Sequence, residues 1–185
     1  MKILYTGGNG KYATELKKYN EGLDITFASK NECNLLSHKS IDEFINTHSY
    51  FDIVISGAYK YPGSSIKGLV ETFTIGVNHL YLIQQLEKLP SFFINLTTIT
   101  DIIDKSYLYR AQKKFMEDLL LRYKNFENKN IKVVNFMPGH IDDENIRKLS
   151  AEKFIEFIKN IKDLELSSNH HFMFDKKINN TIPYA

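Results

Sequence analysis

A glycine-rich turn close to the N-terminus is the feature that most constrains the fold of this chain. The apolar run Ile3–Tyr5 has the composition of a strand, Gly7-Gly8-Asn9-Gly10 follows after Thr6, and Lys11–Lys18 can form a helix. In such a unit the glycines let the backbone turn tightly and approach a ligand, and the start of the helix offers N–H groups and partial positive charge. At the beginning of an α/β pattern, the turn favours a dinucleotide-phosphate cradle over a purely structural turn.

Strand and helix patterns alternate along the rest of the chain. The sequence predicts strands over Ile3–Thr6, Ile25–Ala28, Phe51–Ser56, Phe92–Leu96 and Lys132–Phe136, and a last short strand within residues 170–178. It predicts helices over Tyr12–Tyr19, Ser40–Thr47 (with Ser40 as its N-cap), Gly68–Lys88, Tyr107–Tyr123 and Ala151–Ile161. The nearly continuous apolar run at residues 51–56 is typical of a parallel strand covered on both faces. The pattern therefore predicts an α/β fold, a doubly wound parallel sheet with helices on both faces.

Length and composition are those of an ordinary globular protein. The 185 residues, 43% hydrophobic and 25% charged, are expected to form a single domain over residues 1–185. A formal charge of +2 with scattered lysines does not favour nucleic acid binding. No apolar run approaches the ~20 residues that cross a membrane, and the N-terminus lacks the design of a signal peptide. We therefore expect a cytoplasmic protein with no nucleic acid or membrane partner.

The cysteine and histidines give no sign of a metal site. With Cys33 as the only cysteine, an internal disulfide and a Cys-based zinc cluster are both excluded. The six histidines show no metal-ligand spacing with carboxylates. His170-His171 are expected at a polar strand edge, and His140 is the histidine nearest the predicted site. We expect no bound metal.

A tyrosine–lysine pair lies in the predicted helix Tyr107–Tyr123. Tyr109 and Lys113 are four residues apart, so a helix places them on one face. A tyrosine with a pKa of ~10 is a poor acid–base group at neutral pH, and a neighbouring ammonium lowers that pKa. Such a spacing also arises by chance in lysine-rich helices. However, the pair follows a strand that ends in Asn95-Leu96-Thr97-Thr98, and open parallel sheets bind ligands at such ends.

Six short motifs, in order from Met1 to about Ile141, resemble those of the short-chain dehydrogenase/reductase family. Three of them are similar to the cofactor turn, the small-residue motif after the fourth family strand and the helix asparagine of the family: Thr6-Gly7-x-x-Gly10-x-x-Ala13, Ser56-Gly57-Ala58 and Asn78. The other three are similar to the strand with the substrate-binding Ser/Thr, the YxASK active site and the PG turn of the nicotinamide pocket: Asn95-Leu96-Thr97-Thr98, Tyr109-x-Ala111-x-Lys113 and Pro138-Gly139.

The resemblance implies an NAD(P)-binding Rossmann fold and an oxidoreductase that moves a hydride to or from a small carbonyl or alcohol substrate. Tyr109 would exchange the proton, and Lys113 would lower the tyrosine pKa and hold the nicotinamide ribose. Thr98, with Thr97 as the alternative, would hydrogen-bond the substrate oxygen, and Asn78 would either hold a relay water or pack the helix. The residues expected at the cofactor are Thr6, Gly7, Asn9, Gly10, Lys11, Tyr12, Ser29, Lys30, Asn34, Leu35, Gly57, Ala58, Lys113, Pro138 and Gly139.

The residues after the second strand bear on the choice of cofactor. An acidic residue there would bind the adenosine ribose diol and repel a 2′-phosphate. The chain instead has Ala28-Ser29-Lys30, in which Ser29 can donate a hydrogen bond and Lys30 supplies positive charge, and Lys11 could add more. We therefore expect NADP(H) to be preferred, with NAD(H) possible. Asn34-Leu35 stands where the family usually has Asp-Leu/Val against the adenine.

The last third of the chain departs from the family pattern. The interval from Thr98 to Tyr109 is short, and Gln112 replaces the usual serine. Asp142-Asp143 occupy a region where the family often has a threonine at the nicotinamide, and the substrate region, about residues 138–185, is reduced. Two alternatives therefore stay open, a catalytically silent nucleotide-binding or regulatory member of the family and an enzyme similar to nucleotide-sugar epimerases.

Two predicted helices carry more apolar residues than one sheet face needs. These residues are Leu69, Phe73, Val77 and Leu80 in the first helix, and Phe115, Leu119 and Leu120 in the second. Members of the family commonly pair these two helices across a two-fold axis. The expected assembly is a homodimer or homotetramer.

Overall fold

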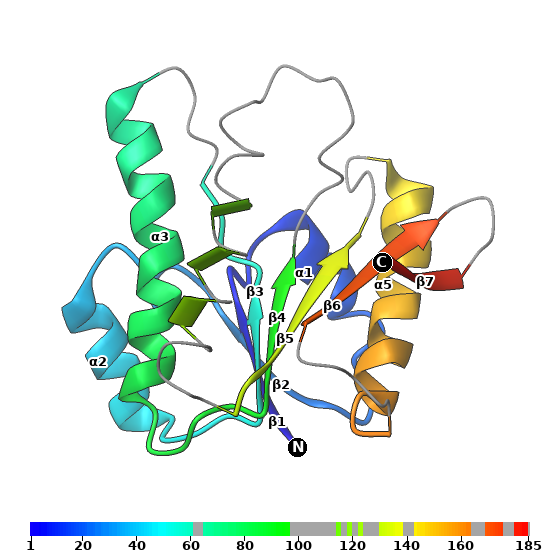
Figure 1. Ribbon diagram of the computed structural model, residues 1–185, viewed down its shortest axis with the longest axis horizontal. Helices are drawn as coiled ribbons and strands as arrows, with labels where there is room; N and C mark the ends of the chain where they lie inside the picture. Colours follow the sequence, from blue (N-terminus) through cyan, green and yellow to red (C-terminus); the bar gives the residue numbers. More distant parts are fainter. Residues whose placement is uncertain are drawn as a thin grey trace.

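The computed structural model of the protein describes residues 1–60, 65–96, 114–115, 118–119, 122–123, 130–138, 143–163, 169–175 and 180–184 (Figure 1). The strands are β1 (Lys2–Thr6), β2 (Asp24–Ala28), β3 (Ile53–Ser56), β4 (Phe92–Leu96), β5 (Lys132–Met137), β6 (Asn169–Asp175) and β7 (Asn180–Tyr184). The helices are α1 (Lys11–Leu16), α2 (His38–Thr47), α3 (Ile66–Gln85) and α5 (Glu144–Asn160).

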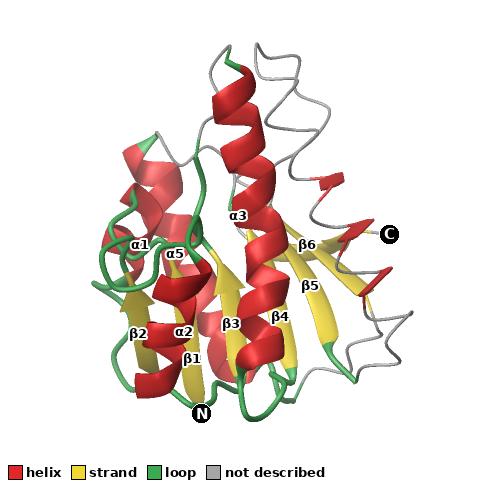
Figure 2. Ribbon diagram, turned by 90° about the vertical axis from the view of Figure 1, so that its left-hand side faces the viewer, coloured by secondary structure: helices red, strands yellow, loops and turns green. Residues whose placement is uncertain are grey.

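One seven-stranded sheet forms the centre of the molecule, in the order β2-β1-β3-β4-β5-β6-β7. The strands from β2 to β6 in this order are parallel, and β7 pairs antiparallel with β6 at one edge. Helices α2 and α3 cover one face, and α1 and α5 cover the other (Figures 1 and 2). The predicted doubly wound sheet is confirmed. Because β2 and β3 lie on opposite sides of β1, the strand order reverses there, and ligands bind at such a point in open α/β sheets.

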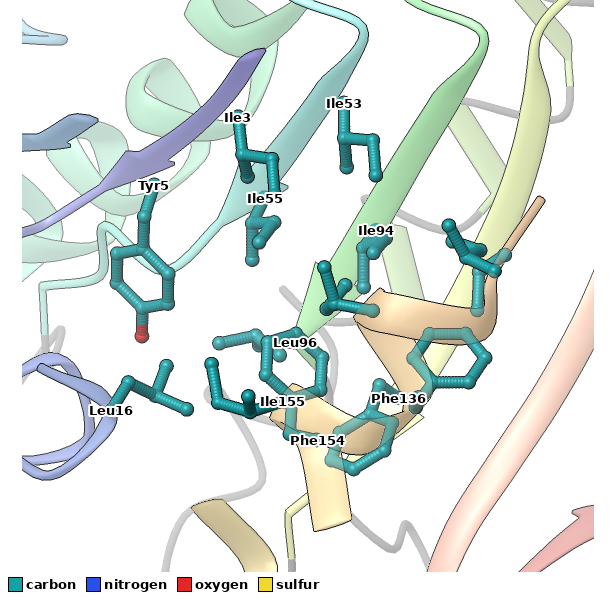
Figure 3. Packing of buried hydrophobic residues seen from close by; sticks show 14 of the residues in the cluster. Ile3, Tyr5, Leu16, Ile53, Ile55, Ile94, Leu96, Phe136, Phe154 and Ile155 are labelled. Carbon is teal, nitrogen blue, oxygen red and sulfur yellow. The ribbon is translucent and has the colours of Figure 1, made fainter. Parts of the chain in front are cut away.

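Each face of the sheet has its own apolar core. Side chains alternate along a strand, so Ile3 and Tyr5 of β1 face α1 and α5, while Leu4 faces α2 and α3. On the first face, Phe136 of β5 packs edge-on against Phe154 of α5, with ring centroids 4.5 Å apart (Figure 3). Strands buried on both faces explain why the sequence shows continuous apolar runs rather than alternation.

Three helices begin earlier than predicted, each at a side-chain cap. The N-cap of α2 is Ser37, whose hydroxyl accepts the Ser40 N–H at 3.3 Å, so the prediction of Ser40 as the cap is wrong. Ser65 caps α3, and Asp143 caps α5, which begins at Glu144 rather than at Ala151. The first turns of these helices contain exposed or polar residues, so apolar periodicity starts only after the helix has begun.

The C-terminal part contains two strands rather than the one predicted within residues 170–178. His170 and His171 lie in β6, which is hydrogen-bonded to β5 on one side and to β7 on the other, so their predicted place at a strand edge is wrong. The strand at the edge is β7, and its Pro183 suits that position because proline cannot donate to a further strand.

The predicted helix Tyr107–Tyr123 lies mostly outside the described residues. Its described residues, 114–115, 118–119 and 122–123, are helical. Among the described residues, no helix is both long enough and apolar enough to span a membrane.

Candidate functional site

The glycine-rich turn lies between the carboxyl ends of β2 and β3. Gly7 has a φ of +80°, and a Cβ added there would lie 2.7 Å from Ala58 Cα, so both its conformation and its packing require glycine. The Gly10 N–H donates to the Gly7 carbonyl at 2.9 Å, and the Gly8 N–H donates to the Ala28 carbonyl at 2.8 Å. These contacts fix the turn at the point where the strand order reverses.

The segment after β3 supports the turn from one side. A Cβ on Gly57 would fall 2.3 Å from Cε1 of Tyr5 and 2.6 Å from the Thr6 carbonyl oxygen. Only glycine lets the chain pass this close to β1. The sequence motif Ser56-Gly57-Ala58 and the glycine-rich turn are therefore parts of one packed unit.

The Thr6 side chain is buried and hydrogen-bonded within the protein. Thr6 is 1% exposed, and its hydroxyl oxygen accepts the Ala58 N–H at 3.1 Å. The same oxygen lies 3.2 Å from the Ile55 carbonyl and 2.9 Å from Nε2 of the buried His79. Thr6 is one of the residues expected at the cofactor, whereas nothing in the local sequence distinguishes His79 from the other histidines as its partner.

Helix α1 differs from the longer helices at its start. It follows Gly10 without a side-chain cap among the described residues, whereas Ser37, Ser65 and Asp143 cap α2, α3 and α5. A helix start that no side chain caps can accept an anionic ligand at its N–H groups. The arrangement fits the phosphate cradle that the sequence predicts.

Two side chains next to the turn have structural contacts. The Tyr12 hydroxyl lies 3.0 Å from Ser150 Oγ and ties α1 to α5, and burial raises the pKa of this phenol well above its usual range. Because its side chain is used in this contact, Tyr12 can reach a ligand only through its backbone. Lys17 donates from Nζ to the Gly8 carbonyl at 2.7 Å and lies over the Phe27 ring.

A carboxylate lies at the carboxyl end of β2. The Ser29 N–H donates to Glu32 Oε2 at 2.8 Å, and hydrogen bonds from the Ser29 side chain and backbone lower the pKa of Glu32. Lys30 is exposed beside them, and its charge also helps to lower the pKa of Glu71. Glu32 is not among the residues expected from the sequence, although Ser29-x-x-Glu32 has the S-x-x-E pattern in which a carboxylate accepts the N–H of the first residue.

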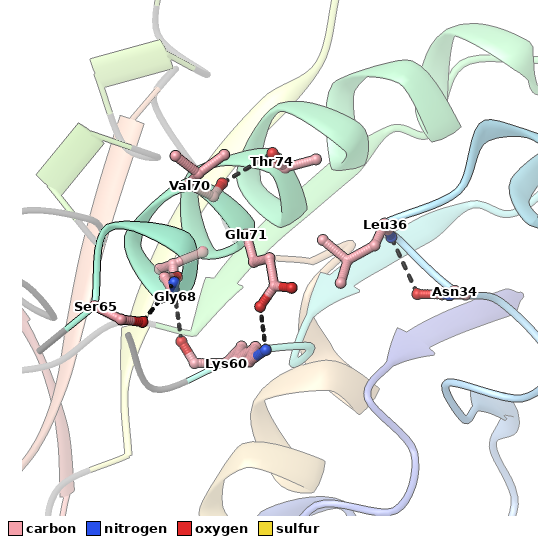
Figure 4. Close-up of polar contacts among 9 residues, drawn as sticks. Asn34, Leu36, Lys60, Ser65, Gly68, Val70, Glu71 and Thr74 are labelled. Atoms are coloured by element: carbon pink, nitrogen blue, oxygen red, sulfur yellow. Dashed lines mark hydrogen bonds and ion pairs between the residues drawn. The ribbon is translucent and has the colours of Figure 1, made fainter. Parts of the chain in front are cut away.

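The predicted adenine-side residues lie in a loop that is fastened to α3. Asn34 accepts the Leu36 N–H through Oδ1 at 3.1 Å (Figure 4). Asn78 donates from Nδ2 to the carbonyl of the buried Leu35 at 2.7 Å, and its Oδ1 lies 3.0 Å from His38 Nε2. These contacts use the amide of Asn78 to pack α3 on the loop, which favours the packing role over the relay role.

A group of polar contacts surrounds the start of α3. Lys60, which follows β3, forms an ion pair with Glu71, and the Ser65 hydroxyl accepts the Gly68 N–H at 3.0 Å (Figure 4). The Lys60 hydrogen bond is the main cause that lowers the pKa of Glu71. Lys30 and Lys60 thus place positive charge near the ends of β2 and β3.

The predicted catalytic residues Thr98, Tyr109 and Lys113 lie outside the described residues, as do Thr97 and Gly139. Pro138 is buried directly after β5. Asp143, which is expected from the sequence to lie near the nicotinamide, caps α5 by accepting the Ile146 N–H at 3.0 Å.

Comparison with known proteins finds no matching family model and no matching curated protein. Among solved structures, a carbonyl reductase from Pseudomonas aeruginosa PAO1 in complex with NADP is 13% identical, with all of both chains covered and a TM-score of 0.73. A short-chain dehydrogenase/reductase (glucose/ribitol dehydrogenase) from Brucella melitensis is 14% identical, with 93% of this chain and 94% of that chain covered and a TM-score of 0.67.

A GDP-L-fucose synthetase from Naegleria fowleri bound to NADP is 10% identical, with 97% of this chain and 79% of that chain covered and a TM-score of 0.70. These identities are low, so the likeness concerns the fold. The chain shares the doubly wound α/β fold with these solved structures, one of which is a short-chain dehydrogenase/reductase and two of which contain NADP.

Proposed function

We propose that the protein is an NADP(H)-dependent oxidoreductase of the short-chain dehydrogenase/reductase type, acting on a small carbonyl or alcohol. The observation that carries this proposal is the glycine-rich turn, in which Gly7 at a φ of +80° packs against Ala58 where the strand order reverses. The turn is followed by α1, whose start has no side-chain cap among the described residues. An extended anionic ligand is the chemistry that such a place accepts.

The residues of the turn and of the neighbouring strand ends would hold the nucleotide. The backbone from Gly7 to Lys11, including Asn9, would contact the phosphates, and Tyr12 would contribute only its backbone. Leu35, Asn34 and Ala58 would lie beside the adenine, while Lys30 and Ser29 would attract a 2′-phosphate. When bound, the cofactor supplies or accepts the hydride. The two NADP-bound structures that share the fold support the choice of NADP(H), with NAD(H) possible.

Tyr109 would give a proton to the substrate carbonyl oxygen or take one from the alcohol. Lys113, one helical turn away, would favour the phenolate by its charge and so bring the tyrosine pKa closer to neutrality. Thr98 would hydrogen-bond the same substrate oxygen, and Pro138-Gly139 would lie next to the nicotinamide. The described contacts of Asn78 support a packing role for this residue rather than a place in a proton relay.

The catalytic assignment is tested with a panel of aldehydes, ketones and quinones and with NADPH as the reductant. Tyr109→Phe should lower turnover by ~10²–10⁴ while leaving the NADPH dissociation constant nearly unchanged, since a positioned acid–base group contributes about this much. Lys113→Ala should lower turnover and also weaken NADPH binding. Tyr107→Phe is the matched control, because two residues in the predicted helix would be separated by about 200° around its axis, so Tyr107 would not share the face of Tyr109.

The outcomes separate the competing functions. Full activity of Tyr109→Phe on any substrate would show that the proposed acid–base pair is wrong. Tight NADPH binding without turnover of any substrate would favour a nucleotide-binding or regulatory protein. Turnover of a nucleotide sugar, but of no simple carbonyl, would favour the epimerase-like alternative.

A further inference from the structure

We propose that His79 is a positioning residue for the glycine-rich turn, and that it acts through the Thr6 hydroxyl on the backbone of Ala58. As far as it concerns the nucleotide, this inference rests on the proposed function. His79 lies on α3, 73 residues from Thr6 in the sequence, and the residue is 1% exposed. The contact joins the helix that covers one face of the sheet to the strand that leads into the turn.

The hydrogen bonds of the imidazole define its role. Nδ1 lies 2.9 Å from the Ile75 carbonyl, and Nε2 lies 2.9 Å from Thr6 Oγ1. Because a carbonyl oxygen can only accept, Nδ1 must carry a hydrogen. In the neutral ring, Nε2 is then an acceptor and takes the hydrogen of the Thr6 hydroxyl. The ring also stands edge-on against Phe93, with centroids 6.0 Å apart, which limits its rotation.

The bond to His79 sets the direction of the Thr6 hydroxyl. Its single hydrogen has two candidate acceptors, His79 Nε2 at 2.9 Å and the Ile55 carbonyl at 3.2 Å. The Ile55 carbonyl already accepts the Gly57 N–H at 3.0 Å. Thr6 Oγ1 keeps its lone pairs with either acceptor, and one of them accepts the Ala58 N–H at 3.1 Å, so the bond to His79 acts by fixing the direction of that lone pair. A connected path therefore runs from α3 through Thr6 to Ala58.

Ala58 forms a wall of the glycine-rich turn. A Cβ on Gly7 would lie 2.7 Å from Ala58 Cα and 2.8 Å from Ala58 N, so the two backbones are in contact. A shift of Ala58 changes the space that the turn leaves for a ligand. An apolar side chain in place of His79 could fill the core, but it could not accept the Thr6 hydrogen. The polar path is costly to bury, and it holds the backbone only while all its members are bonded.

The experiment compares His79→Leu, His79→Gln and Thr6→Val with the unmodified protein in two measurements. The first is the NADPH dissociation constant from a fluorescence titration, and the second is the hydrogen-exchange rate of the Ala58 amide measured by NMR without ligand. His79→Leu should weaken NADPH binding about tenfold and speed Ala58 exchange by a similar factor, as expected for one lost hydrogen bond. His79→Gln keeps a polar group near Thr6 and should restore most of both.

The double variant Thr6→Val/His79→Leu distinguishes a shared path from two separate effects. It should bind NADPH no more weakly than Thr6→Val alone, because both changes break the same path. The control is Ile83→Ala, which removes buried side-chain volume from the same helix and the same core. Ile83→Ala should lower the melting temperature. It should leave the NADPH dissociation constant unchanged, and also the exchange rate of the Ala58 amide relative to the other core amides of the same variant.

Equal effects of His79→Leu and Ile83→Ala would overturn the proposed role of His79. If His79→Leu is folded and changes NADPH affinity and Ala58 exchange no more than Ile83→Ala does, His79 is only a core residue. If His79→Leu does not fold, Thr6→Val breaks the same contact from the other end and decides the question. If the unmodified protein binds no nicotinamide nucleotide, the proposed function fails, whereas Ala58 exchange still shows whether His79 holds the turn.

Discussion

At the residue scale, the end of β2 carries opposite charges close together. Glu32 accepts the Ser29 N–H at 2.8 Å, and Lys30 lies between them in the sequence. If a 2′-phosphate binds here, the lysine attracts it and the carboxylate repels it. We therefore expect Glu32→Gln to raise the affinity for NADPH relative to NADH by roughly 3–10-fold, since charge effects at an exposed site are partly screened. Lys30→Ala should lower the same ratio.

Fluorescence titrations with both nucleotides measure this ratio. Glu87→Gln is the control, because it makes the same charge change just after the C-terminal end of α3, away from the end of β2. It should leave the ratio unchanged. An unchanged affinity ratio in both Glu32→Gln and Lys30→Ala would show that neither charge interacts with a 2′-phosphate. Tighter binding of NADH than of NADPH by the unmodified protein would show that the expected preference is wrong.

At the scale of elements, a buried carboxylate joins α1 to α5. Glu15, whose side chain is 5% exposed, pairs with Lys18 at 3.0 Å and with Arg147 of α5 at 3.6 Å. The Lys18 hydrogen bond is the largest cause that lowers the pKa of Glu15, and the charges of Lys18 and Arg147 add to it, although burial opposes them. The folded-state pKa therefore lies below the unfolded-state value. The stability that this group contributes is present above the unfolded-state pKa and is lost as the pH falls through the folded-state pKa.

Glu15→Gln should lower the free energy of unfolding by roughly 1–2 kcal/mol at neutral pH, and the difference should shrink as the pH falls below about 4. Urea unfolding across this pH range measures the effect. Glu43→Gln is the control, because its pairing with Lys39 at 3.8 Å is fully on the surface and should contribute less than about 0.5 kcal/mol. Equal losses in the two variants would contradict the role given to Glu15.

At the scale of the whole molecule, α3 presents an apolar face to solvent. Ile66, Val70 and Val77 are 81%, 57% and 45% exposed, and Val70, Phe73 and Val77 line part of a groove of about 720 Å³. Phe73 also packs edge-on against Phe115, with ring centroids 4.8 Å apart. Apolar side chains at this spacing form one continuous stripe on a helix, and exposed stripes mark interaction surfaces. From this face of α3 we propose the homodimer or homotetramer that is expected from the sequence.

Val70→Lys/Val77→Lys should convert the assembly to monomers, because it would place charge in the centre of a self-complementary interface. Sedimentation velocity at micromolar concentration measures the state. Lys148→Glu, on α5 at the opposite face of the sheet, should leave the assembly intact. A monomeric unmodified protein at this concentration would rule out the proposed assembly.

The sequence by itself determined the order of the strands from β1 to β6 and the place of the glycine-rich turn. Strands such as Phe92–Leu96 are read correctly because burial on both faces demands an unbroken apolar run, and that demand is local. The turn at Gly7 is predictable for a similar reason. Glycine adopts a φ such as +80° without steric cost, and this preference belongs to a single residue. The strand–helix alternation then allows few arrangements other than a doubly wound parallel sheet.

The tertiary structure alone decided which distant side chains meet. The pairing of β7 with β6 makes β6, which contains His170 and His171, an internal strand of the sheet. This pairing depends on how the C-terminal part of the chain folds back on the sheet. The contact between His79 and Thr6 needs both the position of α3 on the sheet and the register of β1 beside β3. The sequence near these two residues determines neither. Local sequence fixes the backbone of each element through sterics and burial, whereas contacts between elements depend on how those elements are packed together.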